Sequence, residues 1–355
     1  MKLPDFPWDA LAPYGQKARA HPGGAIDLSQ GTPVDPTPEF IQAELRAASN
    51  SPSYPVTTGS KDLRDAMERY GREVLGASGE FDVLPTIGSK EMVALLPFLL
   101  EAKRILIPKI AYPTYKVGGL LNRAEVIEVD IDPISWPTKD VDLVWINSPS
   151  NPTGRVHSED ELKSVLQWSR KYSIPIASDE CYLPFPDLKR AISILELAQG
   201  DNSGLIALHS LSKRSNLAGY RAAFAIGDSS LIKRLLEIRK HMGMMVPLPV
   251  QRAMAVALSD EEHVGLQAER YRNRRRELAS ALTEIDYRVD HSDAGLYIWC
   301  TNGKSDWDSV SWFAERGVIV TPGGFYGDFG KEHIRIALTA TDSKIKEVIA
   351  RIRNG

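Results

Sequence analysis

The middle of the chain alternates short apolar runs with amphipathic stretches. The runs FDVLPTIG, RILIPKI, EVIEVD, DLVWINSPS, IPIASDE and GLIALHS have the length of buried strands, whereas SKEMVALLPFLLE and SEDELKSVLQWSRKY have helical length and spacing. The second helical stretch begins with a capping-box pattern, Ser158 and Glu161. This alternation predicts an α/β fold with a mostly parallel central sheet.

The pattern changes near residue 247. A long charged helical stretch over about 250–284 leads to the runs YRVD, GLYIWC, GVIVTPG and HIRIALTA, which predict a smaller α+β domain. A Pro-rich N-terminal arm, a short strand in AIDLSQGTP and a helix in PTPEFIQAELRAAS come first along the chain, and we expect them to join this domain. We therefore predict a large domain over 46–246 and a small domain formed by 1–45 and 247–355.

The composition narrows the class of protein. With 355 residues, of which 43% are hydrophobic and 25% charged, the chain is ordinary for a globular protein with an ample core. Its net charge of −3 gives no indication of nucleic acid or an anionic membrane as a partner. Two cysteines, Cys181 and Cys300, argue against a disulfide framework. The start is broken by prolines, unlike a signal peptide, and no run approaches the roughly 20 apolar residues of a membrane span. We expect a cytoplasmic protein.

Small polar or charged residues end the predicted strands. Gly88 and Ser89 follow the first run, and Asn147, Asp179 and Ser210 end three later ones. Ligands of parallel α/β sheets bind at the carboxyl ends of the strands. These positions are therefore the first candidates for a functional site.

Common nucleotide and metal motifs do not explain these positions. The string TNGKS has Ile298 where a phosphate-binding loop needs its leading glycine, and FGKEH has Phe325 there. No G-x-G-x-x-G follows a predicted strand, and the histidines and cysteines lack metal-ligand spacing. Asp179 and Glu180 are neighbours on a strand and would point to opposite faces. We predict no metal site.

A longer motif follows the last strand of the large domain. SLSKRSNLAGYRAA resembles the lysine motif of the class I/II pyridoxal-phosphate aminotransferases at every position of the pattern. YPVTTGSKDLR, GSKE, YPTY, NSPSNPTG, SDECY and HIRIAL also occur in the family's order, so the resemblance covers almost the whole chain. It implies the fold type I architecture, pyridoxal 5'-phosphate as cofactor, amino-acid and 2-oxo-acid substrates, and a homodimer with shared active sites.

The resemblance also assigns roles to residues of this chain. It implies that Lys213, Asp179 and Tyr182 are catalytic. The cofactor-binding residues that it implies are Gly88, Ser89, Lys90, Tyr112, Asn151, Asp179, Tyr182, Ser210, Ser212, Lys213, Arg221 and, from the neighbouring subunit, Tyr54. The substrate-binding residues that it implies are Gly31, Asn151 and Arg335. Lys90 is equally explained as a surface lysine in the first turn of a helix.

The chemistry of each group agrees with its implied role. Lys213 must lose a proton before it can bind the cofactor's aldehyde, and nearby cations such as Arg221, together with desolvation, favour that loss. Ser89 opens a helix whose N-terminus suits the phosphate. Asp179 would keep the pyridine nitrogen protonated. Arg335 would hold the substrate's α-carboxylate through a bidentate fork.

The substrate is suggested by the N-terminal segment. LPDFPWDALAPYGQKARAHPGGAIDLSQGTPVDPTPEF resembles the start of actinobacterial N-succinyldiaminopimelate aminotransferases. Such a substrate carries carboxylates beyond the α-carboxylate. The cations considered for these extra carboxylates are Lys109, Lys116, Arg123 and Arg214.

Other activities of the fold remain open. An aminotransferase of aspartate or aromatic amino acids, or a C–S β-lyase, would use the same cofactor residues. A non-catalytic regulator with this domain would usually add a DNA-binding segment, and none precedes the Pro-rich start.

Overall fold

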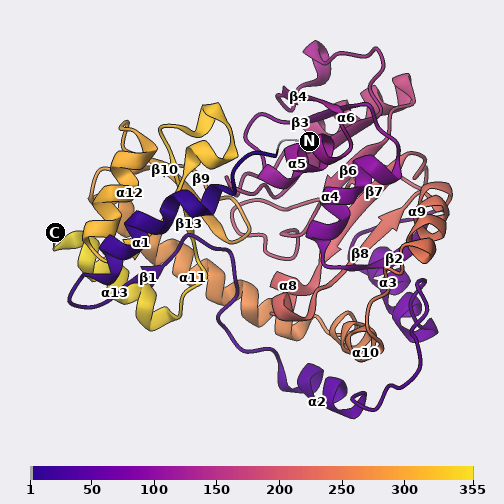
Figure 1. The fold of residues 1–355 in the computed structure, drawn as a ribbon, viewed down its shortest axis with the longest axis horizontal. Helices are drawn as coiled ribbons and strands as arrows, with labels where there is room; N and C mark the ends of the chain where they lie inside the picture. The colour runs from indigo at the N-terminus through magenta and orange to yellow at the C-terminus, as the bar shows by residue number, and fades with distance from the viewer. Residues whose placement is uncertain (1–2, 355) are drawn as a thin grey trace.

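A seven-stranded sheet forms the centre of the larger part of the molecule (Figure 1). The structure is a computed structural model and describes residues 3–354. β8 runs antiparallel to both of its neighbours, while the strands from β7 to β4 are parallel. In spatial order the strands are β2 (Asp82–Ile87), β8 (Ala222–Gly227), β7 (Leu205–Ser210), β6 (Ile176–Asp179), β5 (Leu143–Asn147), β3 (Arg104–Pro108) and β4 (Glu125–Val129). The predicted α/β fold with a mostly parallel sheet is confirmed.

Helices cover both faces of this sheet. Along β5, Val144 and Ile146 pack in one apolar cluster, and Leu143 and Trp145 pack in another on the opposite face. Because both faces are buried, the strands are continuous apolar runs without polar alternation. The covering helices are α3 (Lys61–Glu73), α6 (Glu159–Tyr172), α7 (Ile194–Leu197) and α10 (Leu248–Ala257) on one side, and α4 (Ser89–Leu99), α5 (Pro113–Leu121) and α9 (Ser229–His241) on the other.

A four-stranded antiparallel sheet organises the smaller part. Its strands, in spatial order, are β12 (Thr321–Pro322), β13 (Ile334–Ala337), β10 (Tyr297–Thr301) and β9 (Arg288–His291). The helices around it are α1 (Ala12–Arg19), α11 (Glu262–Glu284), α12 (Asp306–Glu315) and α13 (Asp342–Arg353). Figure 1 shows the indigo N-terminal helix α1 beside the orange and yellow C-terminal helices. β1 (Ile26–Asp27) pairs in parallel with β11 (Val318–Ile319), so the N-terminal segment is hydrogen-bonded to the C-terminal part of the chain.

The N-terminal segment also reaches the larger sheet. Ile41 of α2 (Glu39–Ala47) is buried in the same apolar cluster as Val250, Ala253 and Met254 of α10. This packing places α2 and α10 beside the large sheet, although both lie in the segments that the sequence assigned to the small domain. The division of the chain at 46 and 247 otherwise stays a prediction.

Short elements complete the described chain. They are α8 (Leu211–Arg214) and the 3₁₀ helices η1 (Pro7–Leu11), η2 (Pro133–Ser135), η3 (Ala218–Tyr220), η4 (Gly323–Tyr326) and η5 (Asp328–Gly330). No helix within residues 3–354 has the length and apolar character needed to cross a membrane.

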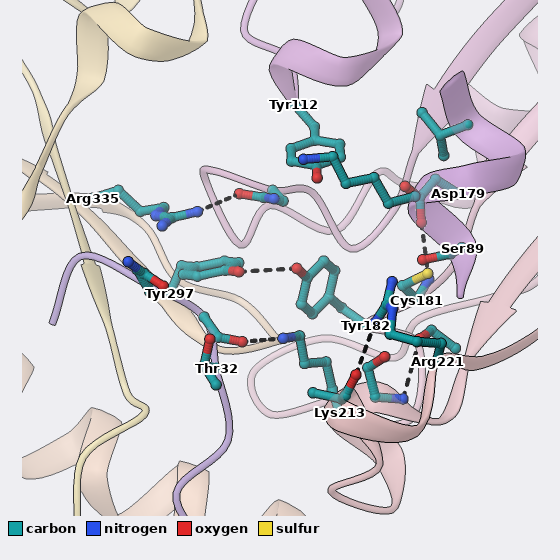
Figure 2. A pocket seen from close by; sticks show the side chains of 18 of the residues that line it. Thr32, Ser89, Tyr112, Asp179, Cys181, Tyr182, Lys213, Arg221, Tyr297 and Arg335 are labelled. Carbon is teal, nitrogen blue, oxygen red and sulfur yellow. Dashed lines mark hydrogen bonds between the residues drawn. The ribbon is translucent and has the colours of Figure 1, made fainter. Parts of the chain in front are cut away.

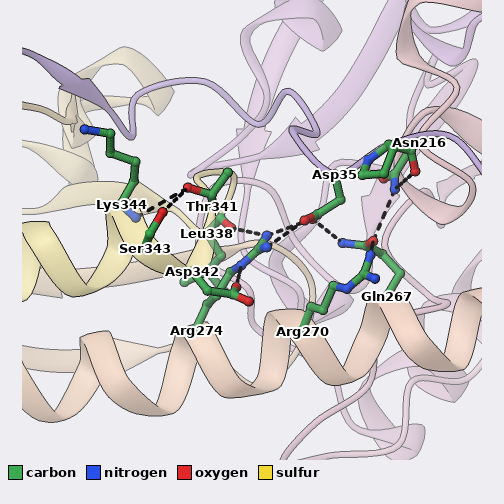
Figure 3. Close-up of polar contacts among 11 residues, drawn as sticks. Asp35, Asn216, Gln267, Arg270, Arg274, Leu338, Thr341, Asp342, Ser343 and Lys344 are labelled. Carbon is green, nitrogen blue, oxygen red and sulfur yellow. Dashed lines mark hydrogen bonds and ion pairs between the residues drawn. The ribbon is translucent and has the colours of Figure 1, made fainter.

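A buried ion pair links the N-terminal segment to α11 (Figure 3). Both terminal nitrogens of Arg274 donate to Asp35, at 2.8 and 2.7 Å, and its Nε donates to Asp342 at 2.6 Å. Gln267 donates to Asp35 and accepts a hydrogen bond from Asn216, which lies near Lys213 in sequence. Burial acts to raise the pKa of Asp35, but hydrogen bonds from Arg274 and Gln267 lower it below its usual value. The network fixes the segment that follows Gly31.

We predict that Arg274→Met lowers the free energy of unfolding by about 3 kcal/mol, because it leaves the Asp35 carboxylate buried without its partner. Urea unfolding of the holoenzyme at neutral pH measures this loss. Because the pKa of Asp35 is lowered, its stabilisation is present at neutral pH and disappears as the pH falls through that lowered pKa. The difference between variant and wild type must therefore shrink in acid.

The matched control is Lys61→Gln, which breaks the exposed ion pair of Lys61 with Asp65 and should leave the free energy of unfolding nearly unchanged, because solvent screens exposed charges. Equal stabilities of Arg274→Met and wild type at neutral pH would contradict the structural role of the pair.

Candidate active site

A cavity of about 640 Å³ lies where the carboxyl ends of β6 and β7 face the small sheet (Figure 2). The predicted site residues that line it are Gly31, Ser89, Lys90, Tyr112, Asn151, Asp179, Tyr182, Ser210, Ser212, Lys213, Arg221 and Arg335. Gly88 does not line the cavity itself but packs against Arg221, and Tyr54 lies outside the cavity with 93% of its surface exposed. The fold therefore gathers residues that span most of the chain.

Lys213 stands on α8, which begins directly after β7. The Ser210 hydroxyl caps this short helix by accepting a hydrogen bond from the Ser212 N–H at 3.1 Å. The Lys213 ammonium donates to the carbonyl of Gly31. Burial lowers the pKa of Lys213 to about 8, and the charges of Arg335 and Arg221 act in the same direction. Lys213 therefore gives up its proton at a much lower pH than an ordinary lysine does.

Asp179 ends β6 and is buried beneath the cavity. Its carboxylate accepts hydrogen bonds from the Tyr115 hydroxyl at 2.8 Å and from the Cys181 N–H at 3.2 Å. Asn147 donates to its backbone carbonyl at 2.8 Å. Burial raises the pKa of Asp179 despite these bonds. A protonated ring nitrogen in the cavity would supply the positive partner that stabilises the carboxylate.

An anion-binding corner forms where β2, β7 and β8 meet. Because β8 is antiparallel to both neighbours, Arg221 just before β8 comes beside Gly88 just after β2. Gly88 has φ +73°, and a Cβ there would lie 2.2 Å from an Arg221 nitrogen. Ser89 starts the eleven-residue helix α4, so the N-terminus of this helix, with its unpaired N–H groups, adjoins the corner. A guanidinium, a helix N-terminus and the nearby serine hydroxyls suit a phosphate dianion.

Arg335 enters the cavity from the small sheet. It is 2% exposed and donates to Asn151 Oδ1 at 2.9 Å and to the carbonyl of Ser29. Its guanidinium carbon lies 4.2 Å from the centre of the Tyr297 ring. Tyr112, at the start of α5, faces the cavity from the large domain (Figure 2). Arg335 is thus held in place, with its planar fork available near the cavity.

Several residues of the site were not among those predicted from the sequence. Tyr297 lines the cavity, and its hydroxyl lies 2.9 Å from that of Tyr182. Tyr115 holds Asp179, and Phe6 and Trp8 bring the N-terminal arm to the mouth. Tyr115 is the second tyrosine of the YPTY motif and could have been found there. Tyr297 sits in a predicted strand that gives no comparable signal.

The cations considered for distal carboxylates lie elsewhere. None of Lys109, Lys116, Arg123 and Arg214 lines this cavity. Lys109 pairs with Asp130 and Lys116 with Glu128, at 2.6 and 3.1 Å. Arg214 is 2% exposed and donates to Glu261 and to the carbonyl of Ala257, where it supports the base of α8. Arg214 therefore lies outside the cavity, although it follows Lys213 directly in sequence.

Comparison with known proteins agrees with this geometry. The family model "Aminotransferase class I and II" matches residues 24–352. The chain belongs to this family. Class I and II aminotransferases use pyridoxal 5'-phosphate, which confirms the predicted cofactor. The donor set in the cavity fits it: an amine of lowered pKa, a buried carboxyl and an anion-binding corner. Residues 3–354 contain no group of three or more histidine, cysteine or acidic side chains arranged to hold a metal ion.

Individual relatives resemble this aminotransferase along its whole length. The probable aminotransferase Rv1178 of Mycobacterium tuberculosis is 47% identical over 99% of this chain and 85% of its own. The 4-dedimethylamino-4-oxo-anhydrotetracycline transaminase OxyQ of Streptomyces rimosus is 45% identical over 99% of both chains. A solved structure from Thermus thermophilus, a probable N-succinyldiaminopimelate aminotransferase, has a TM-score of 0.90 and 28% identity, covering 98% of this chain and 100% of its own.

We predict that Gly88→Ala weakens cofactor binding by at least about tenfold, because the added carbon displaces Arg221 from the anion-binding corner. Titration of apoenzyme with pyridoxal phosphate measures the affinity. Gly24→Ala is the matched control, since Gly24 has a similar φ of +69° but open space around the added carbon. It should strain the backbone without changing the affinity. Equal affinities of the two variants would refute the proposed corner.

We also predict that the rate at which apoenzyme binds the cofactor's aldehyde covalently rises with pH through a midpoint of about 8, because only the neutral Lys213 amine reacts. Stopped-flow absorbance measures this midpoint. Arg335→Gln should raise it, since removal of a nearby positive charge favours the ammonium form. A midpoint near the ordinary lysine value of 10.5 in the wild type would contradict the burial of Lys213.

Proposed function

We propose that this aminotransferase exchanges an amino group between N-succinyl-LL-2,6-diaminopimelate and 2-oxoglutarate, forming N-succinyl-2-amino-6-oxopimelate and glutamate, in lysine and diaminopimelate biosynthesis. Full-length likeness to the Thermus protein supports this substrate class. The observation in the structure that carries the proposal is a cation, Lys90, at the mouth of the cavity, beyond the groups that would hold the cofactor and the α-carboxylate.

Lys90 lies in the first turn of α4 and is exposed. Its ammonium lies 5.8 Å from the centre of the Phe6 ring and 6.0 Å from that of Tyr112. No ion pair joins it to an acidic residue within the described chain. The other basic residues that line the cavity are Lys213, Arg221 and Arg335, each with a proposed partner. The resemblance assigned Lys90 to the cofactor, but its place at the mouth favours contact with a distal carboxylate of the substrate.

A first group of cavity residues would bind the cofactor's phosphate and its ring nitrogen. When bound, pyridoxal phosphate holds the substrate nitrogen covalently and delocalises the electron pair left at the α-carbon. Gly88, Ser89, Ser210, Ser212 and Arg221 bind its phosphate. Asp179 holds the proton on the ring nitrogen.

A second group of residues positions the ring and the substrate. Tyr182 and Asn151 would donate hydrogen bonds to the cofactor's ring oxygen, and Tyr112 would cover a face of the ring. Arg335 clamps the α-carboxylate, with the backbone of Gly31 beside it. The Lys213 amine would then act as the base that accepts the substrate's α-proton and later releases it.

We further propose that the enzyme is a cytoplasmic homodimer. Tyr54 is 93% exposed and Val56 is 56% exposed, as expected for a segment that packs on a partner. In such a dimer Tyr54 would reach the phosphate bound by the other subunit. Cys181 and Cys300 are both buried and free, which supports a reducing compartment.

A second candidate function is amination of a polycyclic oxo compound. It is favoured by 45% identity to the OxyQ transaminase over 99% of both chains. Phe6, Trp8 and Tyr112 line the mouth of the cavity and could pack against a flat ring system. This substrate has no need of Lys90, so the two candidates differ in their response to its removal.

We predict that N-succinyl-LL-diaminopimelate is the best amino donor in a panel with 2-oxoglutarate, and that Lys90→Met raises its KM about tenfold, the loss of one charge-assisted contact. Glutamate formation measures the activity. Lys233→Met, which removes an exposed lysine on α9, is the matched control and should leave KM unchanged. An unchanged KM in Lys90→Met would show that Lys90 does not bind the substrate.

The same panel separates the alternatives. Faster reaction of aspartate, aromatic amino acids or an aminated polycyclic compound would overturn the proposed substrate and leave the aminotransferase activity standing. Pyruvate and free thiol from cystathionine would indicate a β-lyase. Lys213→Ala must lose both activity and the visible absorbance of lysine-bound cofactor; retention of both would disprove the site assignment.

A further inference from the structure

The hydroxyls of Tyr182 and Tyr297 meet inside the cavity (Figure 2). Their oxygens lie 2.9 Å apart, and the side chains are 8% and 2% exposed. Tyr182 follows β6 of the large sheet, whereas Tyr297 begins β10 of the small sheet. The contact therefore joins the two sheets at the point where the cofactor's ring oxygen is expected.

The number of protons determines the direction of this hydrogen bond in the holoenzyme. Burial raises the pKa of Tyr297 and raises that of Tyr182 well above its ordinary value, so both phenols are neutral. Each hydroxyl then has one proton to donate. If Tyr182 donates its proton to the cofactor's ring oxygen, the proton in the 2.9 Å contact must come from Tyr297. A hydroxyl that accepts one hydrogen bond becomes a stronger donor in the next.

The position of the Tyr297 oxygen is held by its surroundings. A Cβ on Gly31 would lie 2.1 Å from this oxygen, so the Gly31 backbone packs closely against it. Arg335 lies over the Tyr297 ring, with its guanidinium carbon 4.2 Å from the ring centre. The ring is thus enclosed on two sides, and its hydroxyl is directed at Tyr182.

We propose that Tyr297 is a positioning residue that acts through Tyr182: by donating to the Tyr182 hydroxyl, it directs the Tyr182 proton to the cofactor's ring oxygen. The inference rests on the role proposed above for Tyr182. A hydrogen bond to the ring oxygen stabilises its negative charge, so it lowers the pH at which the lysine-bound cofactor gives up its proton. That pH is visible as the midpoint of the holoenzyme's absorbance change.

The test is a double-variant cycle on the holoenzyme without substrate. Tyr297→Phe should move the absorbance midpoint upward by about half a pH unit, and Tyr182→Phe should move it further. In the Tyr182→Phe background, Tyr297→Phe should cause no additional shift, because the hydroxyl through which it acts is gone.

The matched control is Tyr326→Phe. The Tyr326 ring also lies near Arg335, at 5.1 Å, but its hydroxyl has no hydrogen-bond partner in the described structure. This variant should leave the absorbance midpoint unchanged. A merely structural role of Tyr297 would lower the thermal unfolding midpoint of Tyr297→Phe without moving its absorbance midpoint.

Three results would overturn the inference, and they differ in whether the proposed role of Tyr182 still stands. If Tyr182→Phe shifts the midpoint and Tyr297→Phe does not, the role of Tyr182 stands and that of Tyr297 is wrong. If the shift caused by Tyr297→Phe persists in full without the Tyr182 hydroxyl, Tyr297 acts by another route. If Tyr182→Phe causes no shift, the proposed role of Tyr182 falls together with the inference.

Discussion

Desolvation of charged side chains in one cavity governs the chemistry of this protein's site. Lys90, Lys213, Arg221 and Arg335 line the cavity, and Asp179 is the acidic residue among its lining. Burial penalises ionised groups of either sign, so it lowers the pKa of Lys213 and raises that of Asp179. The same desolvation that makes a lysine nucleophilic therefore also prepares a carboxyl to receive a positively charged ring.

The topology of the large sheet places these groups without long loops. Parallel strands bring Asp179 and Lys213 to one edge, and the reversed strand β8 returns Arg221 to that edge from the opposite direction. Gly88 allows the close approach of Arg221, which a side chain at that position would block. The anion-binding corner thus depends on the reversed direction of one strand, β8.

The small sheet and the segment after β1 supply one wall of the cavity. Arg335 and Tyr297 lie on neighbouring strands of that sheet, and Gly31 lies just beyond β1, which pairs with β11. The buried pair of Asp35 and Arg274 holds the segment after Gly31. The shape of this wall therefore depends on how the N-terminal segment packs on the C-terminal part of the chain.

The fold class, the cofactor and most of the cavity residues could be predicted from apolar periodicity and local motifs, because both reflect short-range constraints. The packing of the two sheets was needed to show that Lys109 and Arg214 lie outside the cavity and that Tyr297, which belongs to no motif, lines it. Side-chain direction and pairing across the two sheets arise from contacts between residues far apart in the chain. Local pattern carries no information about those contacts, so it could not have revealed the hydrogen bond between Tyr182 and Tyr297.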